Sequence, residues 1–245
     1  MSFLELFKSS PLIAAHRGFS HFNPENTLRA LEFSLGCCDF IEIDVQLSSD
    51  KRAIIFHDED LQRTTNIGRS IKVYELSYKE LSKLDYGSWF DGVYEPLLDL
   101  ETTLEFAKKH NMPLNIELKD ISEFYTDVEF VSIVLDLIES FEMQENILLS
   151  SFRHKYLALI KEIKPNILTA ALVEDRLPKN PIEYLRSLGA KAYNISDNLA
   201  DLKTIEILKE SGIFVNVYTI NDEKRAKELF EMGINAIFSD KLMKS

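Results

Sequence analysis

The feature that most constrains the fold is a repeated unit in which an amphipathic helix, a glycine and a short apolar strand follow one another. Three such units stand near the C-terminus, as PIEYLRSLGAKAYNIS, IEILKESGIFVNVYTI and AKELFEMGINAIFSD. Each glycine, like Gly36 earlier in the chain, falls just after a helix, where a left-handed residue commonly ends it. The units share an architecture without sharing a sequence, and they predict alternating helices and strands.

The alternation extends along the chain. Strands are predicted at residues 12–15, 40–47, 53–57, 114–118, 147–150, 168–173, 192–195, 214–219 and 236–238. Helices are predicted at residues 25–35, 100–110, 128–142, 154–163, 181–188, 202–211 and 222–232. Several strands are apolar on both faces, as parallel strands covered by helices are. We therefore predict a single α/β domain over residues 1–245, a (β/α)8 TIM barrel, with a doubly wound open sheet as the alternative.

Two features depart from an ideal barrel. Nine strands are one too many, and only SSDKR separates the second from the third, which is too short for a parallel crossover. We expect residues 53–57 to return antiparallel at the barrel mouth. Residues 58–96 then form an insertion with one short helix near residues 75–84, acting either as a lid or as packing over one end of the barrel.

Composition excludes several partners. The net charge of −12 argues against nucleic acid and anionic membrane surfaces, and no apolar run is long enough to span a bilayer. Adjacent Cys37 and Cys38 are expected to be free thiols that pack against neighbours, which indicates a reducing compartment. We expect a cytoplasmic protein, either a monomer or a homodimer.

Paired polar residues lie on two strands. Glu42 and Asp44 are two residues apart, so their carboxylates face the same side, and Glu117 and Lys119 repeat this spacing. Three carboxylates on an inward face need compensating charge, which a divalent cation with oxygen ligands would supply. The alternative is a salt-bridge network that joins the three carboxylates to Arg17 and Lys119.

Two of the five histidines follow strands, and they are candidates for a general acid and a general base. His16 ends the first strand, and a hairpin near residues 49–51 would bring His57 opposite the carboxylates. Arg17 and Lys119 beside a cation form a phosphate site. The other histidines are expected on the surface or in loops: His21, His110 and His154. Asn23 is expected to cap the first barrel helix before Pro24.

These motifs resemble those of the glycerophosphodiester phosphodiesterases. They stand in family order as HRGFSHFNPENT, IEIDVQLSSD, IIFHDEDLQRTTNIG, LDYGSWF, LNIELK, SSF, NVYTIN and GINAIFSD. Tyr218 stands where the family usually has Trp, and Ala236 where it has Gly. The resemblance implies a phospholipase-C-like TIM barrel of the cytosolic bacterial type.

The resemblance further implies a metal-dependent hydrolase that converts glycerophosphodiesters to sn-glycerol 3-phosphate and an alcohol. It implies a catalytic pair, a phosphate site and a pocket residue, with a cation that is Mg²⁺, Ca²⁺ or Mn²⁺ held by three carboxylates. The residues are His16 and His57 for catalysis, Arg17, Lys119 and Tyr218 for substrate, and Glu42, Asp44 and Glu117 for the metal. Alternatives are a lysophospholipase D, a metal-free barrel isomerase or lyase, and a non-catalytic phosphodiester-binding protein.

Overall fold

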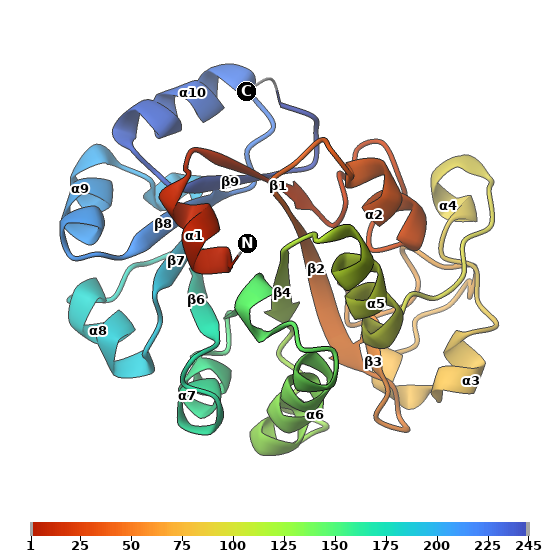
Figure 1. Cartoon of the computed structure of the whole chain (residues 1–245). Coiled ribbons are helices and arrows are strands. Elements are labelled where there is room, and N and C mark those ends of the chain that lie inside the picture. The colour runs from red at the N-terminus through yellow and green to blue at the C-terminus, as the bar shows by residue number, and fades with distance from the viewer. Residues whose placement is uncertain (1, 244–245) are drawn as a thin grey trace.

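The computed structural model describes residues 2–243, so both ends of the predicted 1–245 domain lie outside the described residues. One sheet has the order β1-β9-β8-β7-β6-β5-β4-β2-β3, and pairing of β1 with β2 closes eight parallel strands into a TIM barrel (Figure 1). This closure excludes the doubly wound sheet. The strands are β1 (Leu12–His16), β2 (Phe40–Leu47), β3 (Ala53–Ile55), β4 (Leu114–Leu118), β5 (Ile147–Ser151), β6 (Leu168–Val173), β7 (Ala192–Ser196), β8 (Phe214–Tyr218) and β9 (Ala236–Ser239).

Helices cover the outside of the barrel, one in each crossover between parallel strands (Figure 1). They are α2 (Leu28–Ser34), α5 (Leu100–His110), α6 (Asp127–Ser140), α7 (His154–Ile163), α8 (Pro181–Leu188), α9 (Leu202–Glu210) and α10 (Glu223–Met232). Short 3-10 turns precede β5 and follow β7, as η2 (Gln144–Asn146) and η3 (Asp197–Leu199). The four glycines that were predicted to end helices all have positive φ, namely Gly36, Gly189, Gly212 and Gly233. None of the helices in the described part of the chain is long and apolar enough to cross a membrane.

Alternation along the strands separates the outer core from the barrel interior. On β2, the side chains of Ile41, Ile43 and Val45 belong to the large outer core under the helices. The residues between them, Glu42 and Asp44, therefore face the interior, as the i, i+2 spacing predicted. All eight residues of β2 are buried, which explains why this strand lacks a solvent-facing polar side.

Helix α1 (Phe3–Lys8) was not predicted from the sequence, because six residues are too few to show a clear period. Its buried residues are Phe3, Leu6 and Phe7, and they pack with Leu12, Phe40 and other side chains inside the barrel. Because Leu12 and Phe40 begin their strands, α1 closes the N-terminal end of the barrel.

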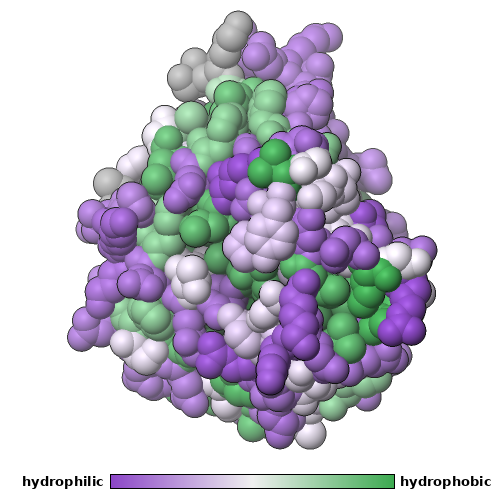
Figure 2. All heavy atoms as spheres, turned by 90° about the vertical axis from the view of Figure 1, so that its right-hand side faces the viewer, coloured by the Kyte–Doolittle hydropathy of each residue, from purple (hydrophilic) through white to green (hydrophobic). Residues whose placement is uncertain are grey.

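The predicted hairpin and insertion are both present. β3 pairs antiparallel with β2, and Val45 lies opposite Ile55. The insertion contains three short helical segments where one was predicted, namely η1 (Val73–Glu75), α3 (Tyr78–Leu81) and α4 (Ser88–Asp91). Its side chains Leu61, Val73, Leu81 and Tyr86 form a small apolar core together with Ile54 of β3 and Phe56, which follows β3. Figure 2 shows this side of the molecule, where hydrophobic patches lie between hydrophilic residues.

The first barrel helix begins later than predicted. Thr27, and not Asn23, caps α2, and its Oγ1 accepts a hydrogen bond of 3.3 Å from the backbone N–H of Ala30. Asn26 has a φ of 58°, which is incompatible with a right-handed helix, so the helix can begin only after it. The Asn26 side chain donates to Asp44 at 2.9 Å, and this contact holds the preceding loop against β2.

Candidate active site

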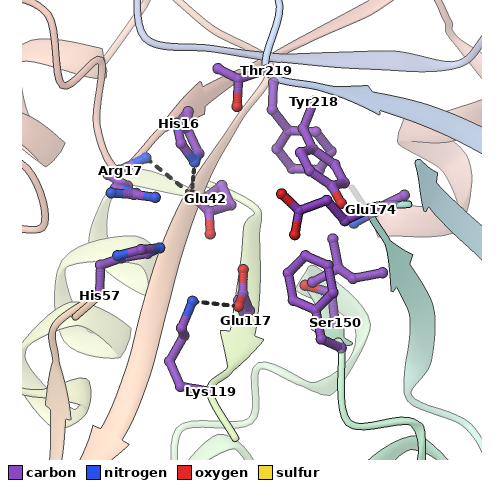
Figure 3. A pocket seen from close by; sticks show the side chains of 14 residues that line it. His16, Arg17, Glu42, His57, Glu117, Lys119, Ser150, Glu174, Tyr218 and Thr219 are labelled. Atoms are coloured by element: carbon purple, nitrogen blue, oxygen red, sulfur yellow. Dashed lines mark hydrogen bonds and ion pairs between the residues drawn. The ribbon is translucent and has the colours of Figure 1, made fainter. Parts of the chain in front are cut away.

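A cavity of about 400 Å³ opens at the C-terminal ends of the barrel strands, where TIM barrels hold their active sites (Figure 3). Most of the residues predicted for the site line it, and Asp44 lies just behind the wall, 1% exposed. The described residues of the 58–96 insertion do not line this cavity. This favours the alternative in which the insertion packs against one end of the barrel, and not the alternative in which it acts as a lid. The lining residues are His16, Arg17, Glu42, His57, Glu117, Lys119, Ser150, Phe152, Leu172, Glu174, Asn194, Tyr218, Thr219 and Phe238.

A strained turn after β1 delivers the first two site residues. Arg17, Gly18 and Phe19 have φ values of 51°, 80° and 60°, three left-handed residues in succession. A Cβ on Gly18 would lie 2.6 Å from the Cβ of Ala30, so α2 leaves room only for glycine. The chain therefore reverses within van der Waals contact of α2, and the backbone N–H of Arg17 reaches Glu42 Oε2 at 3.1 Å.

Each cavity histidine has an aspartate on its Nδ1 atom. The distance is 2.6 Å from His16 to Asp240 and 2.7 Å from His57 to Asp58. A carboxylate can only accept, so Nδ1 carries the proton and Nε2 remains for chemistry in the cavity. Burial raises the pKa values of both aspartates, but their hydrogen bonds outweigh this effect and bring both pKa values well below the usual range. The donors to Asp240 are His16, Asn221 and Ser20, and the donors to Asp58 are His57 and Arg63.

No local pattern indicates that Asp240 is the partner of His16, because 224 residues separate them. The only available signal was that Asp240 directly follows the last strand. Of the other histidines, His21 and His110 are exposed, as predicted. The prediction for His154 was wrong, because its Nδ1 lies 2.6 Å from the Tyr184 hydroxyl and its Nε2 lies 2.9 Å from the Leu172 carbonyl oxygen.

Three carboxylates converge beside the histidines. Oxygens of Glu42, Asp44 and Glu117 all lie within 4.8 Å of one another. Burial raises the pKa of Glu42 well above its ordinary value, and the charges of Asp44 and Glu117 raise it further. Burial and Asp44 also raise the pKa of Glu117, although Lys119 opposes them. Asp44 behaves differently: the effect of its burial is outweighed by nearby cations, Lys119 and Arg17 first, and its pKa falls far below the usual range.

Ion pairs join Asp44 and Glu117 to two cations, which is part of the network that the salt-bridge alternative predicted. Lys119 Nζ lies 2.7 Å from Glu117 and 3.4 Å from Asp44. Arg17 lies 2.9 Å from Glu25 and 3.5 Å from Asp44. The pKa of Lys119 is raised, because these carboxylates outweigh the effect of its burial. Two cations do not balance the four acidic groups Glu25, Glu42, Asp44 and Glu117. Among the described residues, Glu42 contacts only the backbone N–H of Arg17 and the His16 ring, whose Nε2 lies 3.9 Å away.

The donor set fits a divalent cation. Three converging carboxylates offer the hard oxygen ligands that Mg²⁺, Ca²⁺ and Mn²⁺ prefer, and burial together with the neighbouring carboxylates raises the pKa values of Glu42 and Glu117, an effect that a bound cation would oppose. A second acidic group, Glu25 with His57 and Asp58, does not fit a cation, because Arg63 already occupies it.

Arg63 connects two halves of the site. It donates to Asp58 at 2.6 and 2.9 Å and to Glu25 at 2.7 and 2.8 Å, two bonds to each carboxylate. Asp58 holds His57, and Glu25 holds Arg17. One guanidinium group of the insertion therefore links a histidine on the hairpin to an arginine after β1.

Sequence reasoning missed two residues of the opposite wall, Phe152 and Glu174. Both line the cavity, and each directly follows a barrel strand. Their position after β5 and β6 was the available signal. Tyr218 lies on the same wall, and its hydroxyl donates to the Val173 carbonyl oxygen at 2.7 Å.

Both cysteines are free thiols. Cys38 packs against the core as expected, but Cys37 is exposed.

The fold and site define a TIM barrel whose mouth combines an acidic, metal-type cluster with two histidines and two cations. The sequence model of the glycerophosphoryl diester phosphodiesterase family matches residues 16–244. The chain belongs to this family of enzymes, as the resemblance of its motifs implied.

Relatives and solved structures agree over nearly the full length. A glycerophosphodiester phosphodiesterase of Bacillus altitudinis is 36% identical, with 93% of this chain and 94% of the relative covered. A phosphodiesterase structure from Oleispira antarctica, in complex with the product sn-glycerol-3-phosphate, matches with a TM-score of 0.89 and 32% identity, covering 97% and 96% of the two chains. A structure from Silicibacter pomeroyi, at 21% identity, matches in fold with the same TM-score and covers 98% and 94%.

Proposed function

We propose that this protein hydrolyses glycerophosphodiesters to sn-glycerol 3-phosphate and an alcohol, with a divalent cation as its cofactor. The observation that carries the proposal is the convergence of two aspartate-held histidines, three carboxylates and two cations at one barrel mouth. The named activity of the Bacillus altitudinis relative and the product bound by the Oleispira antarctica enzyme support the same chemistry.

Glu42, Asp44 and Glu117 would hold the cation, which is Mg²⁺, Ca²⁺ or Mn²⁺. Such a cation, when bound, neutralises phosphate oxygens and lowers the pKa of an oxygen nucleophile. The three carboxylates supply only oxygen ligands, and this favours hard cations over zinc or copper.

Arg17 and Lys119 would bind the phosphate of the substrate. The guanidinium group of Arg17 lines the cavity and is held there by Glu25, at 2.9 Å from Nη1, and by Asp44, at 3.5 Å from Nε. The Lys119 ammonium group lies on the same wall of the cavity (Figure 3). Both would stabilise the charge that develops on the phosphate oxygens in the transition state. Tyr218 would contact the glycerol or the alcohol from the opposite wall.

His16 and His57 would transfer the protons. One Nε2 takes the proton of the nucleophile, a P–O bond forms, the P–O bond to the alcohol breaks, and the other histidine gives that alcohol its proton. The nucleophile is either the 2-hydroxyl of the glycerol, giving a cyclic phosphate that water then opens, or water directly. Asp240 and Asp58 would keep each ring in the tautomer that this exchange needs.

A coupled assay for sn-glycerol 3-phosphate tests the proposal. The protein is given a panel of glycerophosphodiesters and lysophosphatidylcholine, first as prepared, then with EDTA, then with Mg²⁺, Ca²⁺ or Mn²⁺ restored. We expect release from glycerophosphodiesters that EDTA abolishes and one of the cations restores. Turnover that survives EDTA would favour a metal-free enzyme. Binding without turnover would favour a non-catalytic protein, and release of lysophosphatidic acid would favour a lysophospholipase D.

We also propose a cytoplasmic location and a monomeric or homodimeric state.

A further inference from the structure

One acidic side chain of the cavity, that of Glu174, is not paired with a cation among the described residues. Glu174 directly follows β6, and its carboxylate points into the cavity toward the wall that carries His16 and Glu42 (Figure 3). Within residues 2–243, this carboxylate has neither an ion pair nor a hydrogen bond. The backbone of the residue is fixed, because its carbonyl oxygen accepts a hydrogen bond from the Ser196 hydroxyl.

The surroundings of Glu174 differ from those of the other cavity acids. Glu117 is paired with Lys119, and Glu42 receives the Arg17 N–H. Glu174 instead shares its wall with two aromatic rings, Phe152 and Tyr218, whose centroids are 6.1 Å apart and whose planes make an angle of 87°. The pKa of Tyr218 is raised by burial and then by the charge of Glu174, which indicates that the carboxylate lies close to this ring.

An acid in this place disfavours most phosphodiesters. The substrate is an anion, and Arg17 and Lys119 on the far wall compensate its phosphate. An unpaired carboxylate across the cavity repels that anion unless the substrate brings a positive charge of its own. A carboxylate beside two aromatic rings is a favourable environment for an ammonium group, which is attracted by both the charge and the ring faces.

We propose that Glu174, with Phe152 and Tyr218, selects glycerophosphodiesters whose alcohol carries an ammonium group, such as choline or ethanolamine. This inference rests on the proposed function and names the substrate class of the same site. Phe152 is 44% exposed and Glu174 is also exposed, so this wall reaches the rim of the cavity. A leaving alcohol placed there can depart to solvent without passing the three carboxylates of the candidate metal site.

The test compares two substrates of similar size. The kcat/KM for glycerophosphocholine and for glycerophosphoglycerol, whose alcohol is neutral, are measured with the wild type and with Glu174→Gln, in the presence of the activating cation. We expect Glu174→Gln to lower kcat/KM for glycerophosphocholine by roughly tenfold, the scale of one partly exposed cation contact. The value for glycerophosphoglycerol should stay unchanged or rise, because repulsion of the anion is removed.

A matched control is Asp175→Asn, which removes one negative charge from the next, exposed residue, which does not line the cavity. It should change neither value. An equal loss on both substrates with Glu174→Gln would overturn the inference, because it would assign Glu174 to the shared glycerol. An unchanged ratio would overturn it as well. If the wild type hydrolysed no diester at all, the proposed function would fail first, and this outcome differs from hydrolysis without preference.

Discussion

The two ends of the barrel interior are built from the same strands and have opposite characters. At the N-terminal end, β1 and β2 contribute Leu12 and Phe40 to an apolar cluster that α1 closes. A few residues further along, the same strands contribute His16 and Glu42 to the cavity. The inward face of these two strands therefore changes from apolar to ionisable along the strand.

The difference shows how one scaffold separates stability from chemistry. The closed end buries large side chains, including Phe3 and Phe7, with the free-energy gain that apolar burial brings. The open end buries acids and cations that are costly to desolvate, and its geometry depends on the rigid strands beneath. Substitutions at the two ends should therefore have different effects, the first on unfolding and the second on turnover.

The largest expected effect lies at the closed end. Phe7 is 1% exposed and stacks on Phe214 with ring centroids 4.5 Å apart. Phe7→Ala should lower the free energy of unfolding by about 3–5 kcal/mol, the usual range for a buried Phe, while kcat of the folded protein stays unchanged. Urea denaturation and the glycerol 3-phosphate assay measure both. Leu4→Ala, on the exposed side of α1, is the control and should leave both nearly unchanged. A loss of kcat in folded Phe7→Ala would show that the two ends are coupled.

At the open end, His57→Ala should lower kcat by at least ~10²-fold, about 2.7 kcal/mol in the activation barrier, with little change in Tm. The reason is that the side chain would move a proton and contributes little to the core. His110→Ala on the exposed part of α5 is the control and should have no effect. Wild-type turnover in a folded His57→Ala protein would refute the assignment.

A smaller effect is expected where the insertion meets the site. Arg63→Lys keeps the charge but cannot make two bonds to Asp58 and two to Glu25 at once. We expect kcat to fall about tenfold with Tm nearly unchanged, since the variant misplaces His57 and Arg17 without removing them. Arg69→Lys, an exposed arginine of the same insertion, is the control. A lower Tm with unchanged kcat would mean that Arg63 only stabilises the fold.

The smallest effect concerns pH. The folded-state pKa of Asp240 is depressed, so its contribution to stability is full above its unfolded pKa of about 3.9 and is lost as pH falls through the folded value. Asp240→Asn removes this contribution. The variant should therefore be less stable than the wild type at pH 7, and the gap should narrow below pH 4. Urea denaturation at pH 7, 5 and 3 measures it, and a gap that widens toward acid would contradict the pKa assignment.

Much of the fold could be predicted, because each strand and helix shows its characteristic period of apolar residues. The lengths of the connections between strands also limit the possible topologies. The antiparallel hairpin followed from the five-residue connection alone. Helix α1 and the start of α2 could not be predicted, since the first depends on a barrel end that must be closed and the second on the contact between Asn26 and Asp44.

The candidate site was predictable where residues are neighbours in sequence and unpredictable where they meet only in space. Spacing alone placed the two carboxylates of β2 on one face. It could not indicate that Arg63 spans Asp58 and Glu25, or that His154 is fixed by Tyr184 and Leu172.

Local periods of two and about 3.6 residues predicted the alternation of strands and helices and the shared face of the polar side chains, and the closure of the barrel settled the choice between a barrel and an open sheet. Contacts between these groups depend on how the chain is folded in three dimensions. The fold joins His16 to Asp240 across 224 residues and raises the pKa of Glu42 while lowering that of Asp44. It also leaves the Glu174 carboxylate without an ion pair within residues 2–243. The physical reason is that electrostatic interactions depend on distance and burial, which are set by the closure of the barrel and not by order along the chain.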